Sequence, residues 1–135
     1  MRARSSVDIV ICDDDPNQRD SIRVCLEMSG ASKNFTEFEL GADAIDYLKS
    51  NKPDLIFLDM GLPDIAGLDV LRELRQYTDT PVIVVSGNET SQSVAQALTI
   101  GSDDYIIKPF VPIELMARVE AVMRRTTSKK VESTR

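Results

Sequence analysis

Five short runs of apolar residues alternate with longer amphipathic segments, and this alternation limits the possible folds more than any other feature of the chain. The runs lie at residues 7–12, 34–40, 54–59, 81–86 and 104–108. They are rich in Val and Ile, which favour strands. The first, third and fourth runs are almost continuously apolar, as are parallel strands that are covered on both faces, whereas the second alternates polar and apolar residues like an edge strand.

The segments between the runs carry the signals of helices. Pro16 suits the first turn of a helix, and Gly30 suits the position just after a helix ends. Further helices are predicted at 42–50, around Leu68, Leu71 and Leu74, around Val94, Ala97 and Leu98 up to Gly101, and from Pro112 through Met123. Five strand and helix pairs predict an α/β fold, a doubly wound five-stranded parallel sheet with five helices and right-handed crossovers.

The chain has the length of a single domain. With 135 residues, 42% of them hydrophobic, it can bury one core, and we expect this domain to span residues 7–125. Residues 126–135, "TTSKKVESTR", lack apolar periodicity and are predicted to be a linker or a disordered tail.

The charge and the residue types argue against several functions. A net charge of −6 disfavours direct binding to nucleic acid or to an anionic membrane, and no apolar run is long enough to span a bilayer or to serve as a secretory signal. The absence of histidine rules out histidine-ligated zinc, Ser-His catalysis and a phosphohistidine donor. Cys12 and Cys25 form no CxxC motif and are predicted to be buried free thiols of a cytoplasmic protein.

Polar residues with complementary chemistry mark the ends of four predicted strands. Asp13 and Asp14 follow the first strand, and Asp59, Ser86 and Lys108 end the third, fourth and fifth. Functional groups gather at the carboxyl ends of parallel strands, so we expect these side chains in one cleft. Carboxylates this close repel each other, and a hard cation such as Mg²⁺ would offset the repulsion while leaving coordination positions for phosphate oxygens.

Each of these residues has a purely structural interpretation when it is considered alone. Aspartates before a proline can cap a helix, and we expect Asp15 to do so. By itself Asp59 could be a turn residue, Ser86 a strand-end hydroxyl and Lys108 a solvated charge. Four other acids are interpreted as turn and surface charges: Asp64, Asp69, Asp103 and Asp104.

Four segments together resemble a known family. They are "DDDP", "FLDMGLPDIAG", "VVSG" and "DDYIIKPF", which occur in this order at the ends of four different strands. Their order and spacing are similar to those of the receiver domain of two-component response regulators, in the CheY-like superfamily, over roughly residues 7–125. The resemblance implies a flavodoxin-like sheet with the strand order 2-1-3-4-5.

The resemblance also implies roles for the acidic residues of the cleft. Asp59 would be the phosphoacceptor. Mg²⁺ would be bound by Asp14, Asp59 and the backbone carbonyl of Gly61, with Asp13 assisting through water. Lys108 would contact the phosphoryl group as a point charge.

Three further positions match features of the family. Ser86 stands where the family has Thr or Ser, and Tyr105 stands at the switch aromatic, although it could also be an ordinary half-buried ring. A phosphoryl group on Asp59 would draw Ser86 inward and open a space for Tyr105. The face formed by helix four, strand five and helix five would then change. The bond between Lys108 and Pro109 would be the family's cis peptide.

A protein of this family is a phosphorylation-dependent signalling switch, not an enzyme with a separate substrate, although it assists its own phosphorylation and dephosphorylation. The resemblance implies that a histidine kinase or a histidine phosphotransfer protein supplies the phosphoryl group. The changed face would control an output domain or a downstream protein.

The last part of the sequence resembles receivers of the winged-helix transcription-factor class, which form a symmetric dimer through salt bridges on that face. Asp104, Glu114 and Arg118 match this pattern. However, residues 88–101 contain no Lys or Arg, and Glu120 places an acid where a base is expected. Because complementary charges are missing, we predict a monomer or a weak, phosphorylation-dependent dimer.

Two other functions use a similar fold. Haloacid-dehalogenase-like phosphatases form an aspartyl phosphate after the first strand in a DxDx motif, and "DDDPN" does place an acid two residues after Asp13. No cap insertion is visible in the sequence. A flavodoxin-like cofactor binder needs a phosphate-cradling loop there, and the acids of "DDDPNQ" would repel a phosphate. The phosphatase therefore stays the alternative, and the aspartate that is labelled distinguishes the two.

Overall fold

The computed structural model describes residues 6–87 and 90–133, and for 127–133 it describes the backbone alone. Strands and helices alternate along the whole chain. The strands are β1 (Ser6–Cys12), β2 (Ser32–Phe38), β3 (Leu55–Leu58), β4 (Val82–Ser86) and β5 (Asp104–Ile107). The helices are α1 (Pro16–Glu27), α2 (Gly41–Leu48), α3 (Gly67–Leu74), α4 (Ser91–Ile100) and α5 (Pro112–Ser133).

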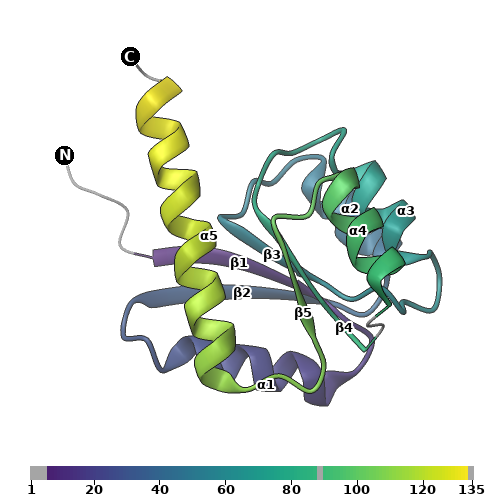
Figure 1. Ribbon diagram of the computed structural model, residues 1–135, viewed down its shortest axis with the longest axis horizontal. Coiled ribbons are helices and arrows are strands. Elements are labelled where there is room, and N and C mark those ends of the chain that lie inside the picture. Colours follow the sequence, from purple (N-terminus) through teal and green to yellow (C-terminus); the bar gives the residue numbers. More distant parts are fainter. Residues whose placement is uncertain (1–5, 88–89, 134–135) are drawn as a thin grey trace.

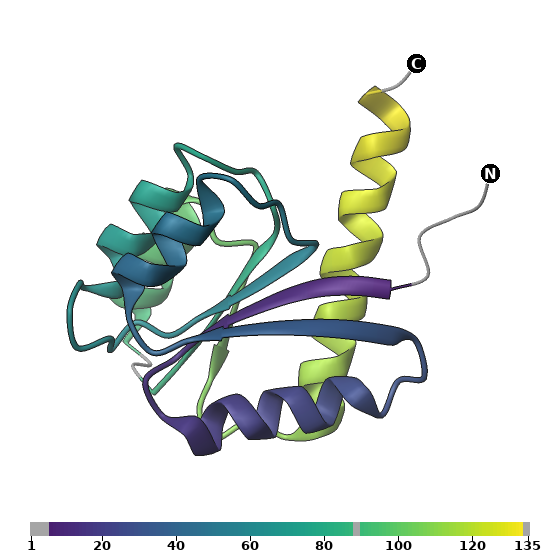
Figure 2. The ribbon, with the colours of Figure 1, turned by 180° about the vertical axis from the view of Figure 1, so that it is seen from behind.

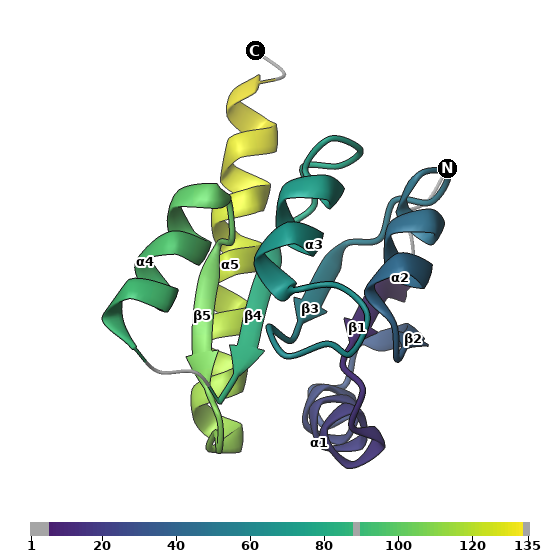
Figure 3. The same ribbon diagram turned by 90° about the vertical axis from the view of Figure 1, so that its right-hand side faces the viewer.

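All strand pairings in the sheet are parallel, and the strand order is β2-β1-β3-β4-β5. Figure 3 shows this order across the view, with β5 at one edge and β2 at the other. The order reverses between β1 and β3, because the chain first adds β2 on one side of β1 and then continues on the other. The predicted doubly wound, flavodoxin-like fold is confirmed.

The helices cover the sheet in two layers, with α1 and α5 on one face and α2, α3 and α4 on the other (Figures 1 and 2). The alternating side chains of β1 supply both cores: Ile9 and Ile11 pack with the α1 and α5 layer, and Val10 and Cys12 with the other layer. All four are at most 2% exposed. Burying an aliphatic side chain of this size contributes roughly 1.5–3 kcal/mol, so these layers fix the positions of the strand ends.

Helix boundaries follow local chemistry. The Asp15 side chain accepts a hydrogen bond from the Asn17 backbone N–H at 2.9 Å, which confirms the predicted cap of α1. Gly30 and Gly101 lie just after α1 and α4. Their φ angles are 88° and 139°, which residues with a Cβ atom rarely adopt, so glycine suits both positions. β2 begins at Ser32, two residues earlier than predicted, because Ser32 continues the ladder opposite Ser6.

Helix α5 is longer than the sequence pattern predicted. We predicted a linker or disordered tail over 126–135. The helix continues to Ser133 and extends beyond the sheet (Figures 1 and 2), and residues 134–135 lie outside the described residues. The physical reason is that no Gly or Pro follows Pro112, and Arg, Lys and Glu all have good helix propensity. The loss of apolar periodicity after residue 125 indicates only that this end of the helix has no apolar face to pack against the core. Its role as a linker stays a prediction.

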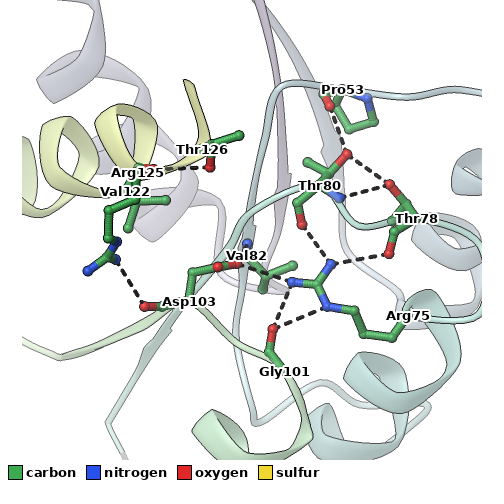
Figure 4. A network of polar contacts seen from close by, with 10 residues as sticks. All are labelled: Pro53, Arg75, Thr78, Thr80, Val82, Gly101, Asp103, Val122, Arg125 and Thr126. Carbon is green, nitrogen blue, oxygen red and sulfur yellow. Dashed lines mark hydrogen bonds and ion pairs between the residues drawn. The ribbon is translucent and has the colours of Figure 1, made fainter. Parts of the chain in front are cut away.

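Arg75 at the end of α3 joins three segments at the side of the sheet opposite the carboxyl ends of the strands (Figure 4). Its guanidinium donates hydrogen bonds to the carbonyls of Gly101 at 2.7 Å and Thr80 at 2.7 Å, and contacts the Asp103 carboxylate at 3.2 Å. Asp103 in turn accepts a hydrogen bond from the Val82 N–H at 2.8 Å. This network ties α3 and the α4–β5 turn to the start of β4, so Asp103 is more than the surface charge we predicted.

Cys12 and Cys25 are buried free thiols, as predicted. Among the helices that the structure describes, none combines the length and the apolar character needed to cross a membrane.

Candidate functional site

Three carboxylates converge where β1 and β3 end. Asp13 and Asp14 follow β1 directly and Asp59 follows β3, and the register that pairs Cys12 with Leu58 brings them side by side. The Asp59 N–H donates to the Cys12 carbonyl at 3.0 Å, which extends the ladder into the site. One carboxylate oxygen from each aspartate lies within 4.8 Å of the others. The three side chains therefore lie together at the carboxyl ends of β1 and β3, next to the point where the strand order reverses.

The three carboxylates differ in their exposure. Asp13 is 2% exposed and Asp59 is 8% exposed, whereas Asp14 lies at the surface. Burial raises the pKa of Asp13, and hydrogen bonds from the Asp15 N–H and from Lys108 offset part of that increase. The cluster thus combines two buried acids with a third acid that is exposed to solvent.

Lys108 supplies a positive charge to the same cleft from the end of β5. Its Nζ lies 3.0 Å from Oδ2 of Asp13 and 3.5 Å from Oδ1 of Asp59. The Lys108 N–H donates to the Ser86 carbonyl at 2.9 Å, so the sheet ladder itself positions the lysine backbone. The peptide bond between Lys108 and Pro109 is cis.

Ser86 ends β4 and is 3% exposed, and Tyr105 in β5 is 7% exposed. The side chains of the two residues share a hydrogen bond, while burial raises the pKa of the Tyr105 phenol. The Tyr105 ring packs in the core that includes Val84 and Ala97. Tyr105 is therefore buried in the unmodified protein, and its movement on phosphorylation stays a prediction.

Gly61 lies beside the acidic cluster. A Cβ atom at this position would lie 3.9 Å from Oδ2 of Asp59. Position 61 therefore lies next to the carboxylate that follows β3, and the role of its backbone carbonyl as a metal ligand stays a prediction.

The chemistry of the donor set fits a hard divalent cation. Three carboxylates face one lysine, which leaves a net charge of about −2 in a partly desolvated cleft if all four groups are ionised. Oxygen ligands with an open side toward solvent suit Mg²⁺, which binds through one or two carboxylates and keeps several waters. Asp13, Asp14 and Asp59 are the residues that could hold it.

Cys12 is another ionisable group close to the cluster. Burial raises its pKa to about 12, and the negative charges of Asp64, Asp13 and Asp59 add to this effect. The thiol is thus a neutral core group that donates weakly to the Leu40 carbonyl. It is not a nucleophile at neutral pH.

Two residues near the site have roles that the sequence analysis missed. Asp64, which we interpreted as a surface charge, accepts hydrogen bonds from the backbone N–H groups of Gly41 and Ala42 at 2.9 Å each and so caps α2. Arg19 on α1 donates to the carbonyl of Asp13 at 2.7 Å. The cap has no local sequence signal, because it lies more than 20 positions from the helix. Arg19 falls one turn after the DDDP segment, a spacing that could have indicated it.

Comparison with known proteins gives a consistent result. The sequence model of the response regulator receiver domain matches residues 9–120. The chain is 38% identical over 120 residues to the transcriptional regulatory protein KdpE of Mycobacterium tuberculosis, covering 89% of this chain and 52% of that protein. It is also 38% identical over 122 residues to the response regulator MprA of Mycolicibacterium vanbaalenii, with coverage of 90% and 52%. The chain thus spans about half the length of these relatives.

Solved structures agree with these relatives. The receiver domain of the Francisella response regulator 1452 superposes with a TM-score of 0.80 at 32% identity, covering 89% of this chain and 98% of that one. A two-component response regulator from Clostridium difficile gives a TM-score of 0.80 at 34% identity with the same coverage.

Proposed function

This chain belongs to the response regulator receiver domain family, and from that membership we propose that Asp59 accepts a phosphoryl group in a cleft that binds Mg²⁺. Receiver domains are regulatory modules of two-component signal transduction, so the phosphorylated state is a signal and not a step of metabolism. The observation that carries the proposal is the convergence of Asp59 with Asp13, Asp14 and Lys108 at the ends of three strands.

The reaction is a nucleophilic displacement at phosphorus. One carboxylate oxygen of Asp59 forms a bond to the phosphorus atom while the bond between phosphorus and the donor's nitrogen or oxygen breaks, and the donor keeps that electron pair. A carboxylate must here approach another anion, so charge neutralisation and in-line positioning account for most of the catalysis. Asp14, Asp59 and the Gly61 carbonyl, with Asp13 assisting through water, would hold Mg²⁺, which would supply part of that neutralisation when bound.

Lys108 supplies another part. Its ammonium group already lies 3.5 Å from Oδ1 of Asp59, close enough to contact a phosphoryl oxygen attached to that carboxylate. Lys108 is also held by Asp13 at 3.0 Å, which restricts it to the cleft. The same arrangement would assist hydrolysis of the acyl phosphate, so the domain promotes both its phosphorylation and its dephosphorylation.

Ser86 and Tyr105 form the switch in this proposal. Their side chains share a hydrogen bond in the unmodified protein. A phosphoryl group on Asp59 presents new acceptor oxygens, and a Ser86 hydroxyl that turned toward them would give up its present hydrogen-bond geometry with Tyr105. The exchange would release Tyr105 from Ser86 and alter the packing of β5 against α4, which carries the change to the face of α4, β5 and α5.

The phosphatase alternative receives no support from the site. Both carboxylate oxygens of Asp13 are engaged, Oδ1 by the Asp15 N–H at 3.0 Å and Oδ2 by Lys108 at 3.0 Å. A carboxylate held in this way is poorly available as a nucleophile. Asp13 is better suited to position Lys108 and to contribute to the cation site.

The proposed partners follow from the chemistry. A histidine kinase or a histidine phosphotransfer protein donates the phosphoryl group, and an output domain or a downstream protein reads the changed face. The relative KdpE is named as a transcriptional regulatory protein. A longer protein that contains this domain could therefore bind DNA elsewhere, and our prediction of no direct nucleic-acid binding concerns this domain alone. The two free thiols support a reducing, cytoplasmic location.

A labelling experiment tests the proposal. The protein is incubated with a small acyl phosphate with and without Mg²⁺, and its intact mass is measured. We expect one phosphoryl group with Mg²⁺, none with a chelator, and none in Asp59→Asn. The matched variant Asp13→Asn should still be labelled, but more slowly. Labelling that persists in Asp59→Asn and disappears in Asp13→Asn would support the phosphatase instead.

A further inference from the structure

We propose that Arg19 is a positioning residue that holds the turn from Asp13 to Asp15 in the geometry that binds Mg²⁺. Arg19 lies outside the cleft, on the first turns of α1, and it touches neither the proposed cation nor the phosphoryl group. This inference rests on the proposed metal site, and it adds a residue that orients the ligands of that site.

The guanidinium of Arg19 links three segments. Its Nη1 donates to the carbonyl of Asp13 at 2.7 Å, and its Nε donates to Oε1 of Glu37 at 3.0 Å. The Arg19 side chain is only 13% exposed. Glu37 lies in β2, directly opposite Ile11 of β1. Arg19 therefore connects the residue after β1 to both α1 and β2.

Asp13 is held at four of its polar groups. Its N–H donates to the Phe38 carbonyl at 3.0 Å, and its carbonyl accepts from Arg19. Its Oδ1 accepts from the Asp15 N–H and its Oδ2 from Lys108, each at 3.0 Å. Of these contacts, the one with Arg19 acts on the peptide unit that joins Asp13 to Asp14.

The orientation of that peptide matters because Asp14 has no comparable support. Asp14 is exposed, and the direction in which its carboxylate points depends on the plane of the preceding peptide. Fixing the Asp13 carbonyl fixes this plane and so limits the directions that the Asp14 side chain can take, and in the structure its carboxylate oxygen lies within 4.8 Å of those of Asp13 and Asp59. Without Arg19, Asp14 would sample other directions, and ordering it would cost part of the binding free energy of the cation.

Charge and geometry predict opposite effects for the loss of Arg19. Removing a positive charge near a cation site should strengthen Mg²⁺ binding, because Coulomb repulsion decreases. Removing a support of the ligand turn should weaken Mg²⁺ binding. The sign of the change therefore separates a positioning role from a purely electrostatic one.

Arg23 provides a matched control. It is one turn further along α1, and its Nη1 donates to the other oxygen of Glu37 at 2.6 Å. Its second polar partner is Asp20, and within the described part of the chain it makes no hydrogen bond to Asp13. Arg23→Met therefore removes one charge and one contact with Glu37, as Arg19→Met does, while keeping the hydrogen bond to the Asp13 carbonyl. Arg19→Lys keeps the charge and can replace at most part of the hydrogen bonding.

The test is the dissociation constant for Mg²⁺ alone, measured by calorimetric titration of the unphosphorylated full chain. We expect Arg19→Met to weaken Mg²⁺ binding by roughly tenfold, the lower end of the effect of residues that orient metal ligands. Arg23→Met should bind as the wild type does or slightly more tightly, and Arg19→Lys should lie between the wild type and Arg19→Met. Melting curves without Mg²⁺ identify the temperature at which every variant is folded, and titrations are made below it.

Mg²⁺ binding by Arg19→Met that equals or exceeds that of Arg23→Met would overturn the positioning role while leaving the metal site intact. A wild-type protein that binds no Mg²⁺ would overturn the metal site itself and this inference with it. The two failures are distinguishable because only the second affects the wild type.

Discussion

The Nζ atom of Lys108 lies 3.0 Å from Oδ2 of Asp13, although 95 positions of sequence separate the two residues. The fold brings them together because β1 and β5 both end at the same edge of the sheet. In the unphosphorylated protein the ammonium group is the internal counterion of a cluster of three carboxylates. This pairing makes Lys108 important for stability as well as for phosphoryl transfer.

Replacing Lys108 by Met should lower the free energy of unfolding without Mg²⁺ by about 1–3 kcal/mol. Breaking a fully buried pair costs roughly 3–5 kcal/mol, and the partial exposure of Lys108 reduces this effect. Because the variant retains all three acids, Mg²⁺ should stabilise it more than it stabilises the wild type. Urea unfolding with and without Mg²⁺ measures both effects.

The ion pair between Lys52 and Asp79 provides the control for this prediction. Both side chains are largely exposed, at 69% and 90%. Lys52→Met should therefore change neither the stability nor its dependence on Mg²⁺ measurably. An equal loss of stability in the two lysine variants would show that the ion pair between Lys108 and Asp13 contributes no more to the free energy of unfolding than an exposed pair does.

The Arg75 network predicts a large difference between two arginines of the same helix. Arg75→Met leaves the carbonyls of Gly101 and Thr80 without their donor, and we expect a loss of about 2–3 kcal/mol in the free energy of unfolding. Arg72→Met removes only an exposed pair with Asp69 and should have little effect. Parallel unfolding curves for the two variants test this, and similar midpoints would contradict it.

The cap of α2 by Asp64 should make stability depend on pH. Hydrogen bonds from the Ala42 and Gly41 N–H groups hold the pKa of Asp64 below its usual value. A carboxyl whose pKa is lower in the folded state contributes stability above its unfolded pKa, and this contribution is lost as the pH falls through the folded pKa. Asp64→Asn should therefore be less stable than the wild type at pH 7, and the difference should shrink as the pH falls below about 4. A difference that stays constant from pH 7 to pH 3 would contradict the ionised cap.

Arg118 supports the prediction that the unmodified protein is a monomer. Its guanidinium contacts Asp104 at 3.1 Å and Glu114 at 3.3 Å within the same chain. The charges that match the dimer pattern are thus already paired internally, and a dimer would have to exchange these pairs for intermolecular ones. We expect light scattering to give a monomer without phosphate, and at most weak association with a beryllium fluoride mimic of the phosphoryl group. A tight dimer of the unmodified protein would contradict this account.

Much of the fold and of the site could be predicted because the necessary signals are local. Continuous Val and Ile runs identify the interior strands, and the polar residue at each strand end falls in one cleft because parallel strands end at the same edge. The positions of Asp13, Asp59 and Lys108 follow from this rule alone. The cap of α1 was equally local, since Asp15 immediately precedes Pro16.

Other features depend on contacts that the sequence does not display. Asp64 caps a helix that begins 23 positions earlier, and Asp103 accepts a hydrogen bond from the first residue of a strand that begins 21 positions earlier. The hydrogen bond between Ser86 and Tyr105 depends on how two strands pack side by side. We did not predict that α5 continues to Ser133, because apolar periodicity indicates only where a helix packs against a core. Residues with good helix propensity can continue a helix without such packing.

We propose that Asp59 carries the phosphoryl group, and locating the modified residue distinguishes Asp59 from Asp13 and Asp14. The protein is treated with Mg²⁺ and a small acyl phosphate, the acyl phosphate is reduced with borohydride, and the reduced residue is identified by peptide mass spectrometry. Reduction converts an aspartyl phosphate to homoserine, so the site is marked by a stable change in mass. The account predicts homoserine at position 59 and unmodified aspartate at positions 13 and 14. Homoserine at position 13 with none at position 59 would contradict it.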